Sequence, residues 1–342
     1  MPKRYLWWLI LFLLPVSLSY AQTSDSTGAG AIFTYTSGED ASFINFPEAS
    51  WLPDSQSFTF GIFSSDDYRR PRIFQYFLAT NEMQTMDTSP LQSALSLQQQ
   101  ETFGAVNWPS VAPDGNMIIY PINDQVCGEG GCSNVLALGN LKTGQHTTIH
   151  KPVDTRNYIH WSADSSAFLI MDFGQYGGVG GIWYGKVPPD MADSIPIEPI
   201  LLANYGTGDI GFVDISPDGE RVLVRDPGDG GARGLRLWDS RAAASPQQFV
   251  AFADGKLILG SDVVVGASFV PDDEQHLMVV AKEGIIRYDL ETDTFEVINP
   301  LINAQTSSWT YFSPDVQYAL VYIRSLDDVS GQQIKLIQLK GD

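Results

Sequence analysis

A short turn motif recurs six times along this chain and constrains its fold more than any other feature. Each copy has an apolar residue three positions before an aspartate, with Pro or Ala directly before the aspartate. The copies are Trp51-Leu-Pro-Asp54, Val111-Ala-Pro-Asp114, Trp161-Ser-Ala-Asp164, Ile215-Ser-Pro-Asp218, Phe269-Val-Pro-Asp272 and Phe312-Ser-Pro-Asp315. Successive aspartates are 60, 50, 54, 54 and 43 residues apart, and such spacings are typical of the blades of a β-propeller.

The chemistry of this motif predicts a tight turn between two antiparallel strands. Pro sets φ for the first corner of a β-turn, and an Asp side chain can accept a hydrogen bond from the backbone just ahead. Gly115 and Gly219 follow two of the aspartates and supply backbone conformations that other residues avoid. We therefore expect a hairpin at each motif.

Each predicted turn leads into a short run of strongly β-forming residues, which we interpret as the second strand of a repeated unit. These runs are Phe58 to Phe63, Met117 to Ile122, Phe168 to Met171, Val222 to Val224, Leu277 to Ala281 and Tyr318 to Ile323. A third strand follows in each unit, at Arg72 to Leu78, Val135 to Leu141, Ile182 to Val187, Leu235 to Trp238, Ile285 to Leu290 and Ile334 to Leu339. In the fifth unit a polar turn and a fourth strand complete the pattern, as far as Ile298.

Four antiparallel strands, repeated six times without helical crossovers, predict an all-β fold, a six-bladed β-propeller with four-stranded blades. A β-sandwich would not need the recurring turn. The best helix candidate runs from Ser89 to Gln100, with Ser as cap and Pro90 at the first position. It would decorate the junction between the first two blades.

The two ends of the chain are expected to close the ring. The sixth unit ends after its third strand, whereas the run Ala31 to Thr36 has no unit of its own. Pairing these segments would protect a sheet edge that is otherwise open. The prediction is a single propeller over residues 22–342, with blades at approximately 38–92, 93–152, 153–205, 206–255, 256–303 and 304–342 plus strand 31–36.

Residues 1–21 have the features of a signal peptide. Two basic residues precede an apolar run from Tyr5 to Leu18, and small residues follow at Ser19 and Ala21. The mature protein is therefore expected to be secreted or periplasmic, with no membrane span after signal removal. An uncleaved anchor is the alternative, although the run contains Pro15 and is short for a bilayer span.

The composition indicates a folded, acidic protein. Hydrophobic residues make up 44% of the chain and charged residues 18%, which suits a substantial core. There are 40 acidic and 20 basic residues, giving a formal net charge of −20, so phosphate backbones would be repelled and no nucleic acid is expected as a partner. The acidity either favours a cationic partner or reflects a solvated surface.

Two cysteines, Cys127 and Cys132, flank a glycine-rich stretch. In an oxidising compartment this spacing favours a disulfide that closes a small loop. A zinc site would need two further ligands, and the nearest histidines, His146 and His150, lie in a predicted strand. We therefore expect no metal. We also expect no cofactor, because the glycine-rich segments Gly174 to Gly181 and Gly228 to Gly234 are followed by predicted strands, whereas a phosphate-binding or dinucleotide-binding loop is followed by a helix N-terminus.

The turn motifs resemble the repeat of the TolB-type propeller family, in which an apolar residue, Ser, Pro, Asp and Gly precede a β-run. The similarity is strongest at Ile215-Ser-Pro-Asp-Gly219 and extends over essentially the whole mature chain. It implies an architecture and says little about activity. Peptidases of the prolyl-oligopeptidase type carry similar propellers, but the Gly-x-Ser-x-Gly elbow of their hydrolase domain does not occur in this sequence.

The long connections between second and third strands form the predicted binding surface, on the face opposite the Pro-Asp turns. Long loops on a rigid scaffold either form an adaptable recognition surface or vary in length without any function, and both interpretations stay open here. This long-loop face would let a monomeric propeller bind a protein, peptide or glycan, and its mostly acidic side chains favour a cationic partner. The residues assigned to it are Asp66, Asp67, Arg69, Arg70, Glu129, Tyr176, Asp226, Asp229, Arg233, Asp327 and Asp328.

An enzyme is the alternative to a binding protein. Forty acidic residues offer many pairs that the fold could bring together. Two carboxylates about 5 to 9 Å apart at the central channel would support a hydrolase or lyase that acts on a glycan. The sequence assigns no catalytic residue.

Overall fold

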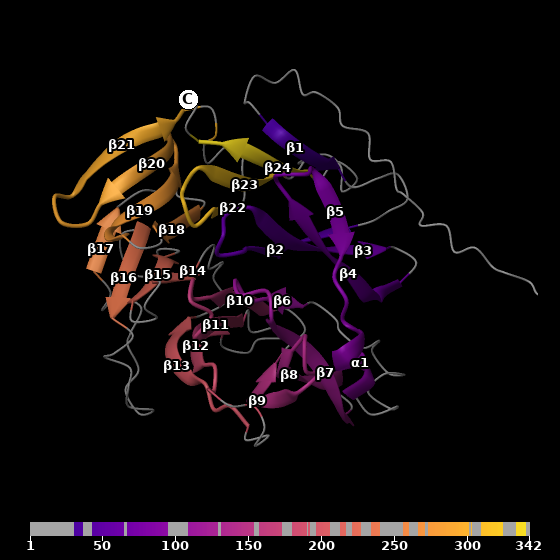
Figure 1. The fold of residues 1–342 in the computed structure, drawn as a ribbon. Coiled ribbons are helices and arrows are strands. Elements are labelled where there is room, and N and C mark those ends of the chain that lie inside the picture. Colours follow the sequence, from indigo (N-terminus) through magenta and orange to yellow (C-terminus); the bar gives the residue numbers. More distant parts are fainter. Residues whose placement is uncertain are drawn as a thin grey trace, which may run out of the picture.

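The computed structural model describes residues 31–36, 43–64, 67–94, 109–128, 131–153, 157–172, 180–189, 191, 196–205, 213–216, 221–226, 234–239, 256–259, 266–270, 273–300, 302, 309–323 and 333–339. Within these ranges the chain forms six four-stranded sheets around a common centre, which is a six-bladed β-propeller (Figure 1). The predicted all-β architecture is confirmed.

In each blade the first strand lies nearest the centre and the pairing is antiparallel throughout (Figure 1). The first two blades are β2 (Phe43–Trp51), β3 (Ser57–Ser64), β4 (Asp67–Phe77) and β5 (Glu82–Thr85), then β6 (Ser110–Val111), β7 (Met117–Gly128), β8 (Gly131–Asn140) and β9 (His146–Val153). The third and fourth are β10 (Asn157–Trp161), β11 (Ala167–Asp172), β12 (Gly180–Lys186) and β13 (Ile200–Tyr205), then β14 (Val213–Ile215), β15 (Arg221–Asp226), β16 (Gly234–Asp239) and β17 (Lys256–Leu259). The fifth is β18 (Gly266–Val270), β19 (Asp273–Ala281), β20 (Gly284–Asp289) and β21 (Thr294–Asn299).

The sixth blade combines the two ends of the described chain. Its inner three strands are β22 (Trp309–Phe312), β23 (Tyr318–Ile323) and β24 (Gln333–Gln338), and its outer strand is β1 (Ala31–Thr36). β1 runs antiparallel to β24, with Thr36 opposite Gln333 and a register shift near Ala31. The run that had no unit of its own in the sequence thus gives the last blade its fourth strand.

The aspartate of the motif caps the turn from within. In the first, second, third and sixth turns its Oδ1 accepts a hydrogen bond from the backbone N–H two residues on, at 2.9 to 3.1 Å. The residue directly after the aspartate has a left-handed backbone, with φ between 54° and 69°, and is Ser55, Gly115, Ser165 or Val316. The motif therefore sets both the side-chain acceptor and the position where glycine is favoured.

Two of these turns also link neighbouring blades. The Ser55 hydroxyl of the first blade accepts a hydrogen bond from the backbone N–H of Asp315 in the sixth, at 2.9 Å. Ser165 of the third blade accepts the same bond from Asp114 of the second, also at 2.9 Å. A serine in the left-handed conformation is less favourable for the backbone than glycine, but its hydroxyl forms a hydrogen bond between blades that glycine could not form.

The fifth turn differs from the sequence-based expectation by one residue. Phe269 pairs with Leu277, eight positions on, with a register shift at Val270, whereas Trp161 pairs with Phe168, seven positions on. Asp273, one place beyond the predicted aspartate, accepts the turn bond from Gln275 N–H at 3.2 Å. The sequence Pro-Asp-Asp contains two aspartates that could accept the turn hydrogen bond, and in the longer turn the second one, Asp273, accepts it.

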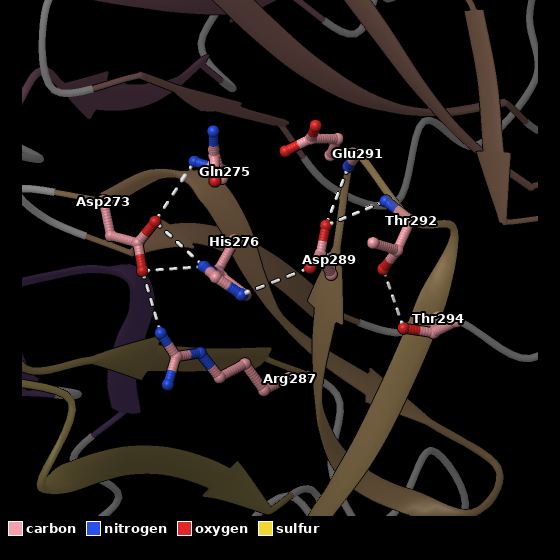
Figure 2. A network of polar contacts seen from close by, with 8 residues as sticks. All are labelled: Asp273, Gln275, His276, Arg287, Asp289, Glu291, Thr292 and Thr294. Carbon is pink, nitrogen blue, oxygen red and sulfur yellow. Dashed lines mark hydrogen bonds and ion pairs between the residues drawn. The ribbon is translucent and has the colours of Figure 1, made fainter.

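Asp273 belongs to a polar network that braces the end of the fifth blade (Figure 2). Its carboxylate accepts hydrogen bonds from His276 Nδ1 and Arg287 Nη2, both at 2.8 Å. His276 Nε2 lies 3.8 Å from Asp289 Oδ2. Burial alone would raise the pKa of Asp273, but the bonds from His276, Gln275 and Arg287 outweigh it and hold the pKa below its usual value.

The core consists of apolar layers between adjacent blades. One layer joins the first and sixth blades through the buried Trp51, Phe58 and Leu336. Trp51 Nε1 donates a 3.0 Å hydrogen bond to the backbone oxygen of Tyr311, so the same indole contributes area and a polar link across the junction. Each blade is thus stabilised mainly by its neighbours, as expected of a repeat architecture.

Two connections that the sequence predicts as loops, Ser64 to Pro71 and Asn123 to Asn134, consist in part of strands. β4 begins at Asp67, and β7 and β8 continue as a hairpin to Gly128 and Gly131 with a register shift after Asn123. These stretches are mostly polar in sequence, but strand pairing satisfies backbone hydrogen bonds even where the side chains are polar. Helix α1 (Ser89–Ala94) begins where predicted, and residues 95–100 lie outside the described chain.

We predict that Val316→Gly stabilises the protein relative to Val316→Ala. Val316 has φ 57°, a conformation unfavourable for a β-branched residue. Both variants remove the apolar side chain, but only glycine relieves the backbone, so its free energy of unfolding should be higher by about 1 kcal/mol. Urea denaturation measures the difference. Equal stability of the two variants would contradict the assigned backbone conformation.

Candidate functional site

A pocket lies at the centre of the ring, at the end of the inner strands that adjoins the Pro-Asp turns. Every blade contributes to it, and it encloses an empty volume of about 740 Å³ including its open mouth. Its lining residues are Ala49, Ser50, Trp51, Ser110, Pro113, Ile159, His160, Trp161, Ala163, Asp214, Ile215, Ser268, Phe269, Tyr311, Phe312 and Pro314.

One position of the repeat supplies a polar lining residue from every blade. It is the residue directly before the apolar residue of the motif, and we name this set the inner ring. In blade order the inner ring is Ser50, Ser110, His160, Asp214, Ser268 and Tyr311. Because the position recurs in each unit, the same fold element places six hydrogen-bonding side chains around one pocket.

A pair of rings spans the pocket. His160 of the third blade stacks on Tyr311 of the sixth, with ring centroids 6.1 Å apart and planes inclined by 23°. The third and sixth blades are opposite in a ring of six, so this contact divides the inner ring into two halves. Ser50 and Ser110 lie in one half, and Asp214 and Ser268 in the other.

In the half of the inner ring that contains Ser50 and Ser110, an indole links two adjacent blades. Trp161 Nε1 donates a hydrogen bond to the Ser110 hydroxyl at 3.1 Å, across the junction of the second and third blades. Trp51 and Trp161 are only 5% and 9% exposed. Both indoles therefore pack mainly into the protein behind the inner ring and expose little surface to the pocket.

The second half holds a fixed carboxylate. Asp214 Oδ2 accepts hydrogen bonds from the Ser268 hydroxyl at 2.7 Å and from the Phe269 backbone N–H at 2.8 Å. Its Oδ1 accepts one from the Ile215 backbone N–H at 2.8 Å. Burial raises the pKa of Asp214 to about 6, although these three bonds act to lower it.

His160 is neutral at physiological pH. Its side chain is buried, and this burial lowers the pKa of the imidazole to about 4. Asp214 carries the negative charge of the pocket above about pH 6, and His160 adds no positive charge there to offset it.

The pocket does not contain the residues that sequence reasoning assigned to the binding surface. Asp67, Arg69 and Arg70 lie in β4 and Asp226 is the last residue of β15, at the end of the blades away from the Pro-Asp turns. The remaining assigned residues lie outside the described chain: Asp66, Glu129, Tyr176, Asp229, Arg233, Asp327 and Asp328. The long-loop face therefore stays a prediction, and the structure adds a second candidate at the opposite end.

The inner ring was missed because no local pattern marks it. The residues before the motif are polar and of four different types, so they suggested neither a strand interior nor a catalytic set. Aligning the six motifs and reading the preceding position would have found them. Among the described residues that line the pocket, Asp214 is the one carboxylate, so they do not form the pair required by the glycan-cleaving alternative.

The described residues contain no group of three potential metal ligands, and none of their helices is long and apolar enough to cross a bilayer.

Comparisons with known proteins support the fold. No family model and no curated protein matches the chain. A chain of the mitotic checkpoint complex is similar in structure, with a TM-score of 0.51 at 9% identity, covering 95% of this chain and 100% of that one. The chain has the propeller fold. At this identity the likeness shows the fold alone.

Two other solved structures are similar at lower TM-scores. TolB from Acinetobacter baumannii has a TM-score of 0.38 and 14% identity, over 86% of this chain and 55% of that one. The Dos1 propeller has a TM-score of 0.46 and 13% identity, over 85% and 66%. The chain thus spans about half the length of TolB.

We predict that Asp214→Asn changes the pH dependence of stability. Because the pKa of Asp214 is raised to about 6, the folded state binds more protons than the unfolded state between about pH 4 and 6, and wild-type stability falls as pH rises through that window. Asn does not titrate. Relative to wild type, the variant should therefore gain on the order of 2 kcal/mol in free energy of unfolding between pH 4 and 7.

His160→Gln serves as the control of opposite sign. The pKa of His160 is lowered to about 4, so the wild type loses stability as pH falls from about 6.5 towards 4. This variant should gain relative to wild type at the acid end. Urea titrations at pH 4.5 and 7.5 measure both effects, and a pH-independent difference for Asp214→Asn would refute the assigned burial.

Proposed function

We propose that this protein is an extracytoplasmic binding protein whose central pocket holds a peptide segment of a protein partner. The observation that carries the proposal is the inner ring, which directs polar residues from all six blades at one open pocket. A rigid ring with a concave centre is suited to recognition. The extracytoplasmic location rests on the signal peptide predicted at residues 1–21.

Binding is favoured over catalysis by the chemistry of the inner ring. Its members are three serines, a neutral histidine, a tyrosine and one carboxylate. The Ser268 hydroxyl donates its hydrogen bond to Asp214, and the Ser110 hydroxyl accepts one from an indole. Neither bond joins a serine to a histidine base, which nucleophilic catalysis requires.

A peptide is favoured over a glycan by the placement of the aromatic residues. Sugar rings pack on open aromatic faces, whereas the indoles of Trp51 and Trp161 are buried and donate their N–H groups to the protein. A peptide can instead use the hydroxyls and the carboxylate of the inner ring through its own N–H groups and side chains.

The test is a pocket-filling substitution with a matched control. Ala163 lines the pocket and is half-buried, whereas Ala79 is an exposed alanine in the turn between β4 and β5. Peptides are selected from a random displayed library on the wild type, and their affinities are measured on Ala163→Trp and Ala79→Trp. We expect at least tenfold weaker binding to Ala163→Trp and unchanged binding to Ala79→Trp.

The long-loop face is tested in the same experiment. A variant with Asp226→Asn and Asp229→Asn should retain the selected peptides if the pocket is the site. If this variant loses binding while Ala163→Trp keeps it, the pocket proposal fails and the loop surface predicted from the sequence is the site.

We also propose a disulfide between Cys127 and Cys132. The β7–β8 register places the two residues directly opposite each other, next to the pair Gly128 and Gly131. Opposed residues in antiparallel strands have Cα atoms about 4.5 to 5.5 Å apart, a separation that a disulfide can bridge. Mass spectrometry of a non-reduced digest should show the linked peptide, and two free thiols in the exported protein would refute the proposal.

A further inference from the structure

Asp214 is unusual among the lining residues because it brings a negative charge into a partly enclosed pocket. Among the described residues, no Lys, Arg or protonated His forms an ion pair with it. Arg221, on the same blade, packs over the Phe269 ring instead, at 5.3 Å from the ring centroid. Burying an uncompensated carboxylate is costly, and proteins commonly retain one where a ligand supplies the opposite charge.

The orientation of the Asp214 carboxylate is fixed before any ligand binds. Three hydrogen bonds from Ser268, Phe269 and Ile215 fix its orientation and come from two adjacent blades. Oδ2 accepts two of these bonds and Oδ1 accepts one, so Oδ1 keeps capacity for a further donor. An arriving cation would find the acceptor already positioned, which reduces the entropic cost of binding.

The neighbours of Asp214 in the inner ring bring no positive charge to this half of the pocket. His160 and Tyr311 flank the half that contains Asp214 and Ser268, and the two rings contact each other across the pocket. His160 is neutral, so it does not repel a positive charge.

We propose that the half of the pocket lined by Asp214 and Ser268 is a subsite for a lysine or arginine side chain of the bound peptide, paired with Asp214. This inference rests on the proposed function and specifies the chemistry that the pocket selects. The overall charge of −20 would help such a basic peptide to approach.

The experiment uses the peptides that bind the wild type at least tenfold more tightly than Ala163→Trp. We expect nearly all of them to contain Lys or Arg. In the tightest peptide each basic residue is replaced in turn by norleucine, which keeps the stem and removes the charge. One such replacement should weaken binding to the wild type at least tenfold and have less than a twofold effect on Asp214→Asn.

Ser268→Ala is the matched control. It removes one hydrogen bond to the Asp214 carboxylate but keeps the negative charge, so the norleucine replacement should still weaken peptide binding to this variant. Should Asp214→Asn fail to fold, the salt dependence of the wild-type affinity gives the same information, since the lysine peptide should weaken more steeply with salt than its norleucine analogue.

The outcomes separate the two proposals. Pocket-dependent peptides without basic residues, or equal norleucine effects on wild type and Asp214→Asn, would overturn the cation subsite and leave peptide binding intact. A selection that yields no pocket-dependent peptide would overturn the proposed function, and the subsite with it.

Discussion

The pairing of β1 with β24 is the constraint on which the rest of the structure depends. It joins residues about 300 positions apart and gives the sixth blade its outer strand. Without it, β24 would present an open edge and the apolar layer between the sixth and first blades would lose Ile32 and Phe33. The central pocket is lined by all six blades, so it depends on the stability of the sixth blade, whose inner strand β22 lies against β2 and β18.

Within that ring, one short motif performs two tasks. Its aspartate and left-handed residue shape the turn, and serines at two of the turns bond to the neighbouring blade. The same turn fixes the register of the inner strand, and thereby the residue that faces the pocket. Substitutions at that residue can therefore alter recognition while the turn chemistry stays unchanged, because Ser50, His160 and Asp214 occupy equivalent positions.

The architecture was predictable because turn chemistry and strand propensity act locally and were repeated six times. The paired segment from Asn123 to Asn134 was not predictable, since strand pairing does not require an apolar pattern. The extra residue before Asp273 was hidden by two adjacent aspartates. The inner ring was not recognisable from any single motif, because its residues differ in type and only an alignment of all six units shows that they share one position.

The most direct test of this account is a comparison of two N-terminal deletions. Removal of residues 22–37 deletes β1, whereas removal of residues 22–30 leaves it in place. Thermal unfolding of both should show a melting temperature at least about 5 °C lower for the longer deletion, consistent with the loss of a few kcal/mol, and a wild-type value for the shorter one. Equal melting temperatures for the two proteins would contradict the claim that β1 completes the ring.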